Sequence, residues 1–266
     1  MGQPGRRLQS AALAVFVFSA AAHSILCANV DVKTIIEKSV AANKADFEAA
    51  PHYSYRQRER TADGDKTYDE IMIAGSPYER LVAVNGKPIS RHDAAKEEEK
   101  LQQARKQRRA ESPEQRRQRI AKYEKDRHRD QAMMNELTKA FTFKLVGQRK
   151  VKSYTVYVLK ATPRPGYKPP NMETQVLTGM QGEMWIDTKT YQWVKVTAEV
   201  IHPVSIVGFL AQVEPGTQFE LEKMPVGNGV WMASHFAMRS HAKVLYMFNR
   251  SSHEDDTFWN YKRVSE

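Results

Sequence analysis

Residues 182–187 read Gly-Glu-Met-Trp-Ile-Asp, and residues 191–196 read Tyr-Gln-Trp-Val-Lys-Val. In both stretches apolar residues occupy every second position, at Met184 and Ile186 and at Val194 and Val196, which is the period of a strand. Met184 and Ile186 lie across a short polar turn at 187–190 from Val194 and Val196. The two stretches therefore predict an antiparallel hairpin with one apolar face.

The same alternation extends through most of the chain from Phe141 to Val264. Glu214-Pro215-Gly216 and Gly227-Asn228-Gly229 punctuate it, and we expect a polar loop at Arg250–Asp256. The further strands that we expect lie at 141–145, 154–158, 206–213, 218–223, 230–238, 244–248 and 257–263. Short strands with this spacing predict an antiparallel meander, and their number favours one large curved sheet with helices on one face.

The amino-terminal third predicts a helix followed by strands. From Asp31 to Phe47 the apolar residues recur at helical spacing, and Asn29 or Asp31 can cap the first turn. Extended segments follow at 53–60, 67–74 and 78–84, with Asp63-Gly64-Asp65 between the first two. We expect this helix to pack on a three-stranded meander.

A strongly charged segment separates the two strand regions. Ser90 with Asp93, and Ser112 with Pro113 and Gln115, are typical of helix starts. They predict helices at 91–110 and 114–140, which form a charged insertion at 90–140. Because apolar residues are scarce in the first of these helices, we expect it to project into solvent.

The amino terminus predicts an export signal. Arg6 and Arg7 precede an apolar run from Ala11 to Ala22, which is too short to span a bilayer comfortably. Cleavage could follow Ala28 or Ser24, and we favour Ala28, so that 1–28 is the signal and 29–266 a single domain. We therefore expect a periplasmic or secreted protein. Lipoprotein anchoring at Cys27 is not expected, because Leu26 and Ser24 do not fit a lipobox.

This order of elements, with the hairpin at 182–196, resembles the superfamily of periplasmic lipoprotein carriers and sigma-factor regulators of the LolA, LolB and RseB type. The resemblance implies an α+β half-barrel whose concave face is covered by helices, and an apolar cavity that binds acyl chains or lipoproteins. The charged insertion is longer than the lid of a dedicated lipoprotein carrier. The alternative for each apolar position is ordinary core. The candidate lining residues are Met184, Ile186, Val194, Val196, Phe219, Leu221, Met232, Phe236, Tyr246 and Phe248.

No arrangement of residues predicts catalysis. With Cys27 removed, the mature chain has no cysteine, which excludes thiol chemistry and disulfides. His202, His235, His241 and His253 lack the paired spacing of a zinc site. Glu254-Asp255-Asp256 lacks the pattern of a calcium loop, and we expect a solvated turn there. The sequence thus favours a non-enzymatic binding protein that has neither a metal nor another cofactor.

The chain contains 41 Lys and Arg against 31 Asp and Glu, a formal net charge of +10. Much of this charge lies at 96–130, where an anionic lipid surface or an acidic envelope protein could bind. Nucleic acid is not expected, because acids are interleaved and aromatic residues are nearly absent there. Two functions remain: a carrier or sensor of lipid or lipoprotein at the cell envelope, and a periplasmic interaction module that docks a partner through its charged helical arm.

Overall fold

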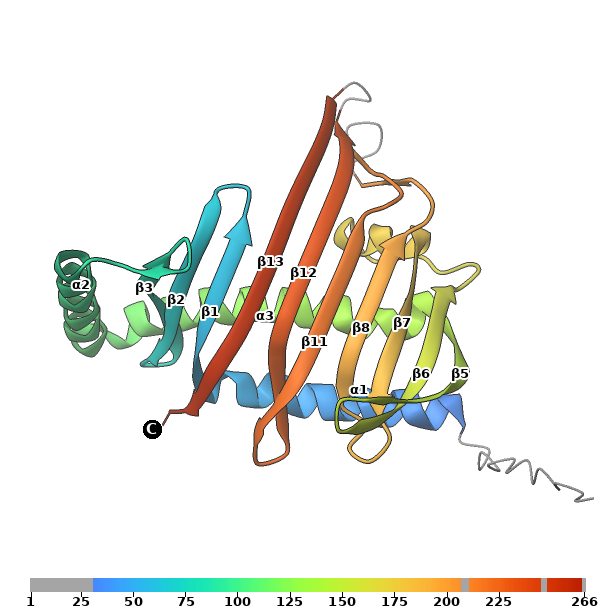
Figure 1. Ribbon diagram of the computed structural model, residues 1–266, viewed down its shortest axis with the longest axis horizontal. Coiled ribbons are helices and arrows are strands. Elements are labelled where there is room, and N and C mark those ends of the chain that lie inside the picture. Colours follow the sequence, from blue (N-terminus) through green and yellow to red (C-terminus); the bar gives the residue numbers. More distant parts are fainter. Residues whose placement is uncertain (1–30, 207–210, 245–247, 265–266) are drawn as a thin grey trace, which may run out of the picture. The chain divides into compact units, whose positions relative to one another are not determined.

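An antiparallel sheet of thirteen strands runs through the described part of the chain, which comprises residues 31–206, 211–244 and 248–264 of this computed structural model (Figure 1). The order of the main strands is β4-β3-β2-β1-β13-β12-β11-β8-β7-β6-β5, with β9 and β10 attached to β12. The strands are β1 (Tyr53–Thr61), β2 (Gly64–Ile73), β3 (Ser76–Val84), β4 (Lys87–Pro88), β5 (Phe141–Val151), β6 (Tyr154–Pro163), β7 (Met180–Asp187), β8 (Trp193–Val200), β9 (Val204–Ser205), β10 (Ala211–Val213), β11 (Gln218–Gly227), β12 (Val230–Val244) and β13 (Phe248–Arg263). The expected hairpin is β7–β8, and the predicted α+β fold with a large curved sheet is confirmed.

The first and last strands are neighbours. Arg58 of β1 pairs with Thr257 of β13, so the amino-terminal meander extends the sheet instead of forming a separate layer. The two sheet edges are the short β4 and the longer β5.

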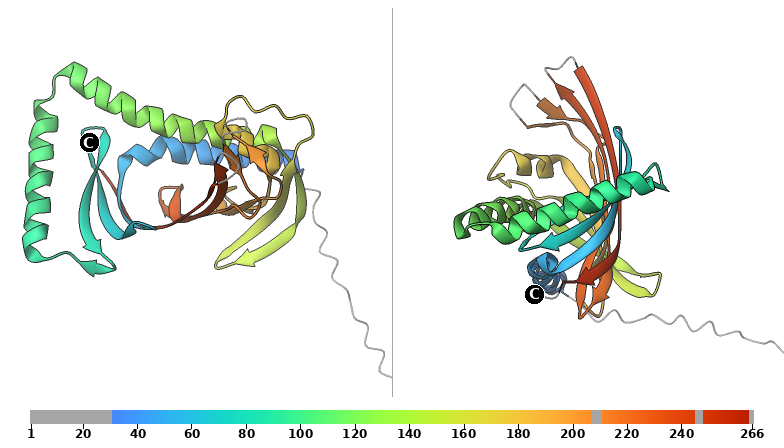
Figure 2. Two further views of the ribbon diagram at one scale, coloured as in Figure 1. Left: turned by 90° about the horizontal axis from the view of Figure 1, so that it is seen from above. Right: turned by 90° about the vertical axis from the view of Figure 1, so that its left-hand side faces the viewer.

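Within the described ranges, three α-helices and two short 3₁₀ helices complete the fold: α1 (Val32–Ala49), α2 (Arg91–Ala110), α3 (Pro113–Ala140), η1 (Ala50–His52) and η2 (Glu173–Gly179). The predicted caps are present, because the side chain of Asp31 accepts from Lys33 N (3.1 Å) and Ser112 forms a capping box with Gln115. Both α1 and α3 lie on one face of the sheet, which bows around them (Figure 2). No helix among the described residues is long and apolar enough to cross a bilayer.

One row of side chains shows how the helix-facing side of the sheet changes character. Residues directly opposite each other on neighbouring strands point to the same face. From β6 to β12 the row contains Leu159, Met184, Val196, Leu221 and Phe236. The next two members, on β13 and β1, are Asp256 and Glu59. The helices therefore cover an apolar half and a carboxylate-bearing half of the same sheet.

The structure corrects three expectations. Residues 250–256 belong to the long strand β13 and do not form a loop, because their polar side chains pair across β12, as in the contact between the Ser240 and Ser252 hydroxyls (2.6 Å). Asp256 of the expected solvated turn is buried. The single strand expected at 206–213 is replaced by β9 and β10, which pair with each other; residues 207–210 are not described.

The third correction concerns α2, which does not project freely into solvent. Its residue Leu101 is only 2% exposed, and α2 packs along β3. The guanidinium of Arg108 donates to the carbonyls of Ile73, Ser76 and Pro77 in the β2–β3 hairpin (2.7–3.0 Å). One buried leucine and one arginine therefore tie this charged helix to the edge of the sheet.

Candidate functional site

A hollow of about 200 Å³ lies between α1, α3 and the sheet. Most of its wall is apolar, and each of the three layers contributes to it. Its lining residues are Val40, Asn43, Asp46, Phe47, Ala50, Gln131, Met134, Asn135, Trp193, Leu221, Lys223, Trp231, Met232 and Ala233. Hollows between helices that combine an apolar wall with a few polar groups are typical ligand sites.

A buried ion pair forms one wall of the hollow and joins α1 to the sheet. The Asp46 carboxylate accepts from Lys223 Nζ (2.5 Å), from the backbone N–H of Trp231 (2.9 Å) and from Gln192 Nε2 (3.1 Å). Lys223 Nζ also donates to the side-chain oxygen of Asn43 (2.9 Å). Burial lowers the pKa of Lys223, and the neighbouring carboxylate of Asp46 opposes this effect. The pair fixes the carboxyl-terminal half of α1 over β11 and β12.

Helix α3 forms the roof of the hollow, and most of its contacts lie near its two ends. The Arg127 guanidinium of α3 lies over the ring of Phe47 in α1, 4.1 Å from its centroid. Away from α1, α3 contacts β3 near one edge of the sheet, and β5 and η2 near the other. Between these attachments Met134 lines the hollow, and its unbranched side chain can adapt to different shapes.

The predicted lining residues fall into several environments. Leu221 and Met232 line the hollow. Met184, Val196 and Phe236 share the helix-facing row of Leu221, and the first two are buried as core. The side chain of Ile186 is completely buried.

The other predicted lining residues lie elsewhere. Val194 is the extra residue of a bulge in β8 and packs with Val156, Val158 and Trp231. Phe219 packs its ring against Phe236, at a centroid distance of 5.4 Å. Tyr246 lies outside the described residues, and only the backbone of Phe248 is described. Two of the ten candidates are therefore found in the wall of the hollow.

Sequence reasoning missed the residues that come from distant parts of the chain. Trp193 and Trp231 line the hollow, yet neither belongs to the expected set. Val40 and Phe47 could have been predicted as lining residues, because they lie on the apolar face of the first predicted helix. The pairing of Asp46 with Lys223 had none, since 177 residues separate the two partners.

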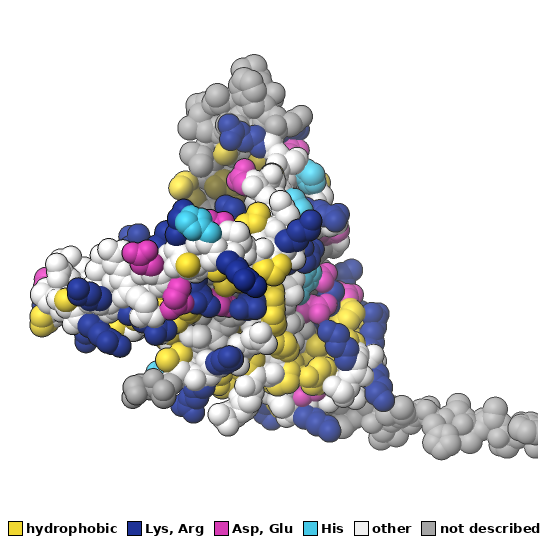
Figure 3. All heavy atoms as spheres, turned by 60° about the vertical axis from the view of Figure 1, so that its left-hand side comes forward, with side chains coloured by type: hydrophobic (Ala, Val, Ile, Leu, Met, Phe, Trp, Pro, Cys, Tyr) yellow, Lys and Arg dark blue, Asp and Glu magenta, His cyan; other side chains and the backbone are white. Residues whose placement is uncertain are grey.

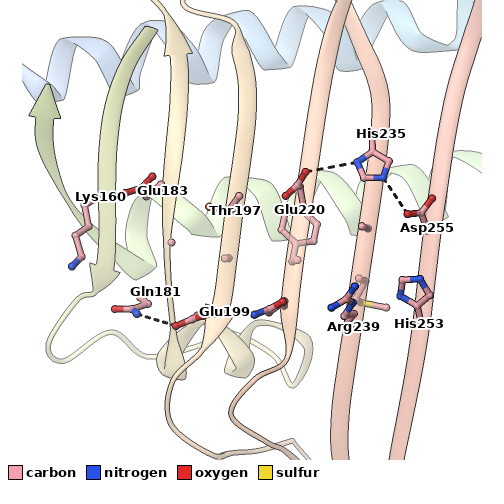
Figure 4. Close-up of a pocket in the computed structure, with 16 residues that line it drawn as sticks. Lys160, Gln181, Glu183, Thr197, Glu199, Glu220, His235, Arg239, His253 and Asp255 are labelled. Atoms are coloured by element: carbon pink, nitrogen blue, oxygen red, sulfur yellow. Dashed lines mark hydrogen bonds and ion pairs between the residues drawn. The ribbon is translucent and has the colours of Figure 1, made fainter. Parts of the chain in front are cut away.

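A second, polar groove of about 630 Å³ lies on the opposite, helix-free face of the sheet (Figure 4). His235 lies between two carboxylates there, with Nδ1 3.8 Å from Glu220 and Nε2 3.4 Å from Asp255. Glu220 also pairs with Lys195 (2.6 Å), and Gln181 donates to Glu199 (3.2 Å). Glu220, His235 and Asp255 are therefore paired with one another, and we interpret the groove as a polar surface.

Among the described residues, no group of three or more His, Cys, Asp or Glu side chains is placed to hold a metal ion. No family model and no curated protein matches the sequence.

Several solved structures are similar in fold. A DUF1329 family protein from Desulfovibrio piger has a TM-score of 0.33 and 12% identity, with 87% of this chain and 92% of that chain covered. A LolA superfamily protein from Nitrosomonas europaea gives 0.32 and 11%, covering 89% and 94%. The MucA/MucB complex of Pseudomonas aeruginosa gives 0.25 and 9%, covering 86% and 99%.

Proposed function

We propose that the protein is a non-enzymatic binding protein of the cell envelope that takes an acyl chain, free or attached to a lipoprotein, into the hollow between α1, α3 and the sheet. The observation behind this proposal is the hollow itself, a concave and mostly apolar surface with a few polar groups in its wall. Concave apolar sites of this kind between helices typically bind small molecules.

The energy of such binding comes from apolar burial. Each methylene removed from water contributes about 0.8 kcal/mol, so about eight methylenes contribute roughly 6 kcal/mol before the cost of ordering the chain. A space of about 200 Å³ is several times the roughly 30 Å³ that one water occupies in the liquid. The hollow therefore suits one segment of an acyl chain, and the adaptable Met134 can widen it.

The alternative, docking of a partner through a free helical arm, is less favoured. Arg108 and Leu101 hold α2 against the sheet, which removes the freedom that such an arm would use.

Quenching of tryptophan fluorescence by a brominated twelve-carbon fatty acid tests the proposal, because Trp193 and Trp231 line the hollow. We expect saturable quenching in the natural protein and its loss in Val40→Phe, which fills the hollow from α1. Val146→Phe is the matched control, because Val146 is 55% exposed on the edge strand β5. Equal quenching of all three proteins, or none in the natural protein, would contradict the proposal.

A further inference from the structure

A third cavity, of about 520 Å³, lies at the corner where α2 meets η1, the β2–β3 turn and the end of β13. It shares no lining residue with the hollow beneath α1, although Ala50 of the hollow is next in sequence to Pro51 of this cavity. The lining residues are Pro51, His52, Met72, Ile73, Ala74, Gly75, Arg105, Arg109 and Val264.

Two arginines one helical turn apart, Arg105 and Arg109, line one side of this cavity. Neither side chain forms a hydrogen bond or an ion pair with any residue in the described ranges. Glu98, which interacts with Arg105 electrostatically, already pairs with Arg80 at 2.7 Å. Both guanidinium groups are therefore available to a ligand.

The neighbouring arginines already have partners within the protein. They add positive charge near the cavity but do not compete for its ligand. Arg119 pairs with Glu111 (2.6 Å) and donates to the Ser76 hydroxyl (2.7 Å), while Arg108 binds the carbonyls of the β2–β3 hairpin. Burial lowers the pKa of Arg108, and the positive charge of Arg119 lowers it further. Lys and Arg side chains are also spread widely over this side of the molecule (Figure 3).

The opposite wall of the cavity is largely apolar, with Met72, Ile73 and Val264 half-buried. A cavity with a cationic side and an apolar side is complementary to a molecule that carries one anionic group on an apolar body. Arginine is well suited to the anionic group, because its planar fork of donors matches the oxygens of phosphate and carboxylate.

We propose that this cavity binds the anionic head of an amphiphile, with Arg105 and Arg109 binding the phosphate or carboxylate oxygens and Met72 and Ile73 contacting the start of the apolar chain. The site does not depend on the hollow beneath α1, because the two share no residue. It gives the basic helix α2 a defined ligand chemistry in place of diffuse attraction to negative charge.

Titration calorimetry with dodecyl phosphate, inorganic phosphate and dodecyl maltoside tests the site. We expect the natural protein to bind dodecyl phosphate, Arg105→Gln and Arg109→Gln each to weaken it about tenfold, and the double variant to weaken it further. Arg116→Gln is the matched control, because Arg116 is exposed on α3 and lines none of the three cavities. It should change the affinity less than twofold.

Two outcomes would overturn the inference, and two further comparisons control for damage to the fold and for binding in the hollow beneath α1. Equal losses in Arg105→Gln and Arg116→Gln would mean diffuse attraction, and equal binding of inorganic phosphate would assign the site to free phosphate. If the double variant loses binding of dodecyl maltoside as well as of dodecyl phosphate, the loss reflects damage to the fold. Arg109 is exposed, so its single variant keeps the test valid if the double variant does not fold. Retained dodecyl phosphate binding in Val40→Phe, together with failed acyl quenching, would separate this site from the proposed function.

Discussion

The helix-facing side of the sheet has two halves, one with buried apolar side chains and the other with buried carboxylates. In the apolar half, on β6, β7, β8 and β11, the row beneath the helices contains Leu159, Met184, Val196 and Leu221. In the carboxylate half, on β1, β2, β3 and β13, the helix-facing residues include Asp256 and Glu70. Both of these acids are buried.

The difference also appears in the charges. Burial, followed by the nearby charge of Glu79, raises the pKa of Glu70 to about 7. Burial also raises the pKa of Asp256 to about 6, and the charge of Glu254 adds to this. Tyr55, which pairs with Glu70 across β1 and β2, has a raised pKa for the same reasons. The apolar half therefore stabilises the fold, whereas the carboxylate half costs stability whenever its acids are ionised.

The largest expected effect concerns the buried charge pair in the wall of the hollow. Asp46→Asn removes the negative charge but leaves Lys223 buried, and we expect unfolding in urea to show a loss of about 3–5 kcal/mol. The double variant with Lys223→Met should recover most of this loss. Glu48→Gln is the control, because Glu48 is exposed on the same helix and should change stability by less than about 0.5 kcal/mol. A small effect of Asp46→Asn would show that α1 is not held by this pair.

The second effect tests the apolar half directly. Ile186→Ala removes a completely buried side chain, and we expect a loss of about 3 kcal/mol in urea unfolding. Val146→Ala, on the exposed surface of β5, should cost less than about 0.5 kcal/mol. Similar losses in the two variants would mean that the apolar half is not the main source of stability.

The third effect is a gain in stability, and it concerns the carboxylate half. The pKa of Glu70 in the folded protein, about 7, lies above its ordinary value of 4.5, so the folded state holds the proton more tightly. The stability from Glu70 is therefore present below pH 4.5 and is lost as the pH rises to about 7. Glu70→Gln should stabilise the protein by about 2 kcal/mol at pH 8 and flatten this part of the pH profile.

Urea unfolding of the natural protein and of Glu70→Gln from pH 4 to pH 8 measures this pH dependence of stability. Glu99→Gln is the control, because Glu99 is exposed on α2. It should leave the profile unchanged. A Glu70→Gln variant that is less stable than the natural protein at pH 8 would show that the ionised carboxylate makes favourable contacts.

In the carboxylate half the sequence predicted β1, β2 and β3 but missed the first part of β13, for a physical reason. Alternation identifies a strand when one of its faces is apolar, as in β7 and β8. In β13 both faces are polar over Arg250–Asp256, and the same rule indicated a loop there. Local spacing also contained no information on long-range pairs, such as β1 with β13 or Asp46 with Lys223.

Helix caps are local, and both charged helices were predicted within one residue of their observed ends. Docking of α2 was missed, because Leu101 is its one buried side chain and isolated leucines are common on exposed helices.

The smallest expected effect comes from the helix-free face, where carboxylates have partners. Glu222 pairs with Lys195 (3.2 Å) and Lys152 (3.3 Å), and these partners outweigh burial and lower its pKa. Its contribution is therefore present above pH 4.5 and is lost as the pH falls through the lowered pKa, which is the reverse of Glu70. Glu222→Gln should cost less than about 1 kcal/mol at pH 7 and almost nothing in 1 M NaCl, because salt screens partly exposed pairs. Unfolding at both salt concentrations checks this, and a loss that persists in high salt would mean that packing, and not charge, holds Glu222 on the sheet.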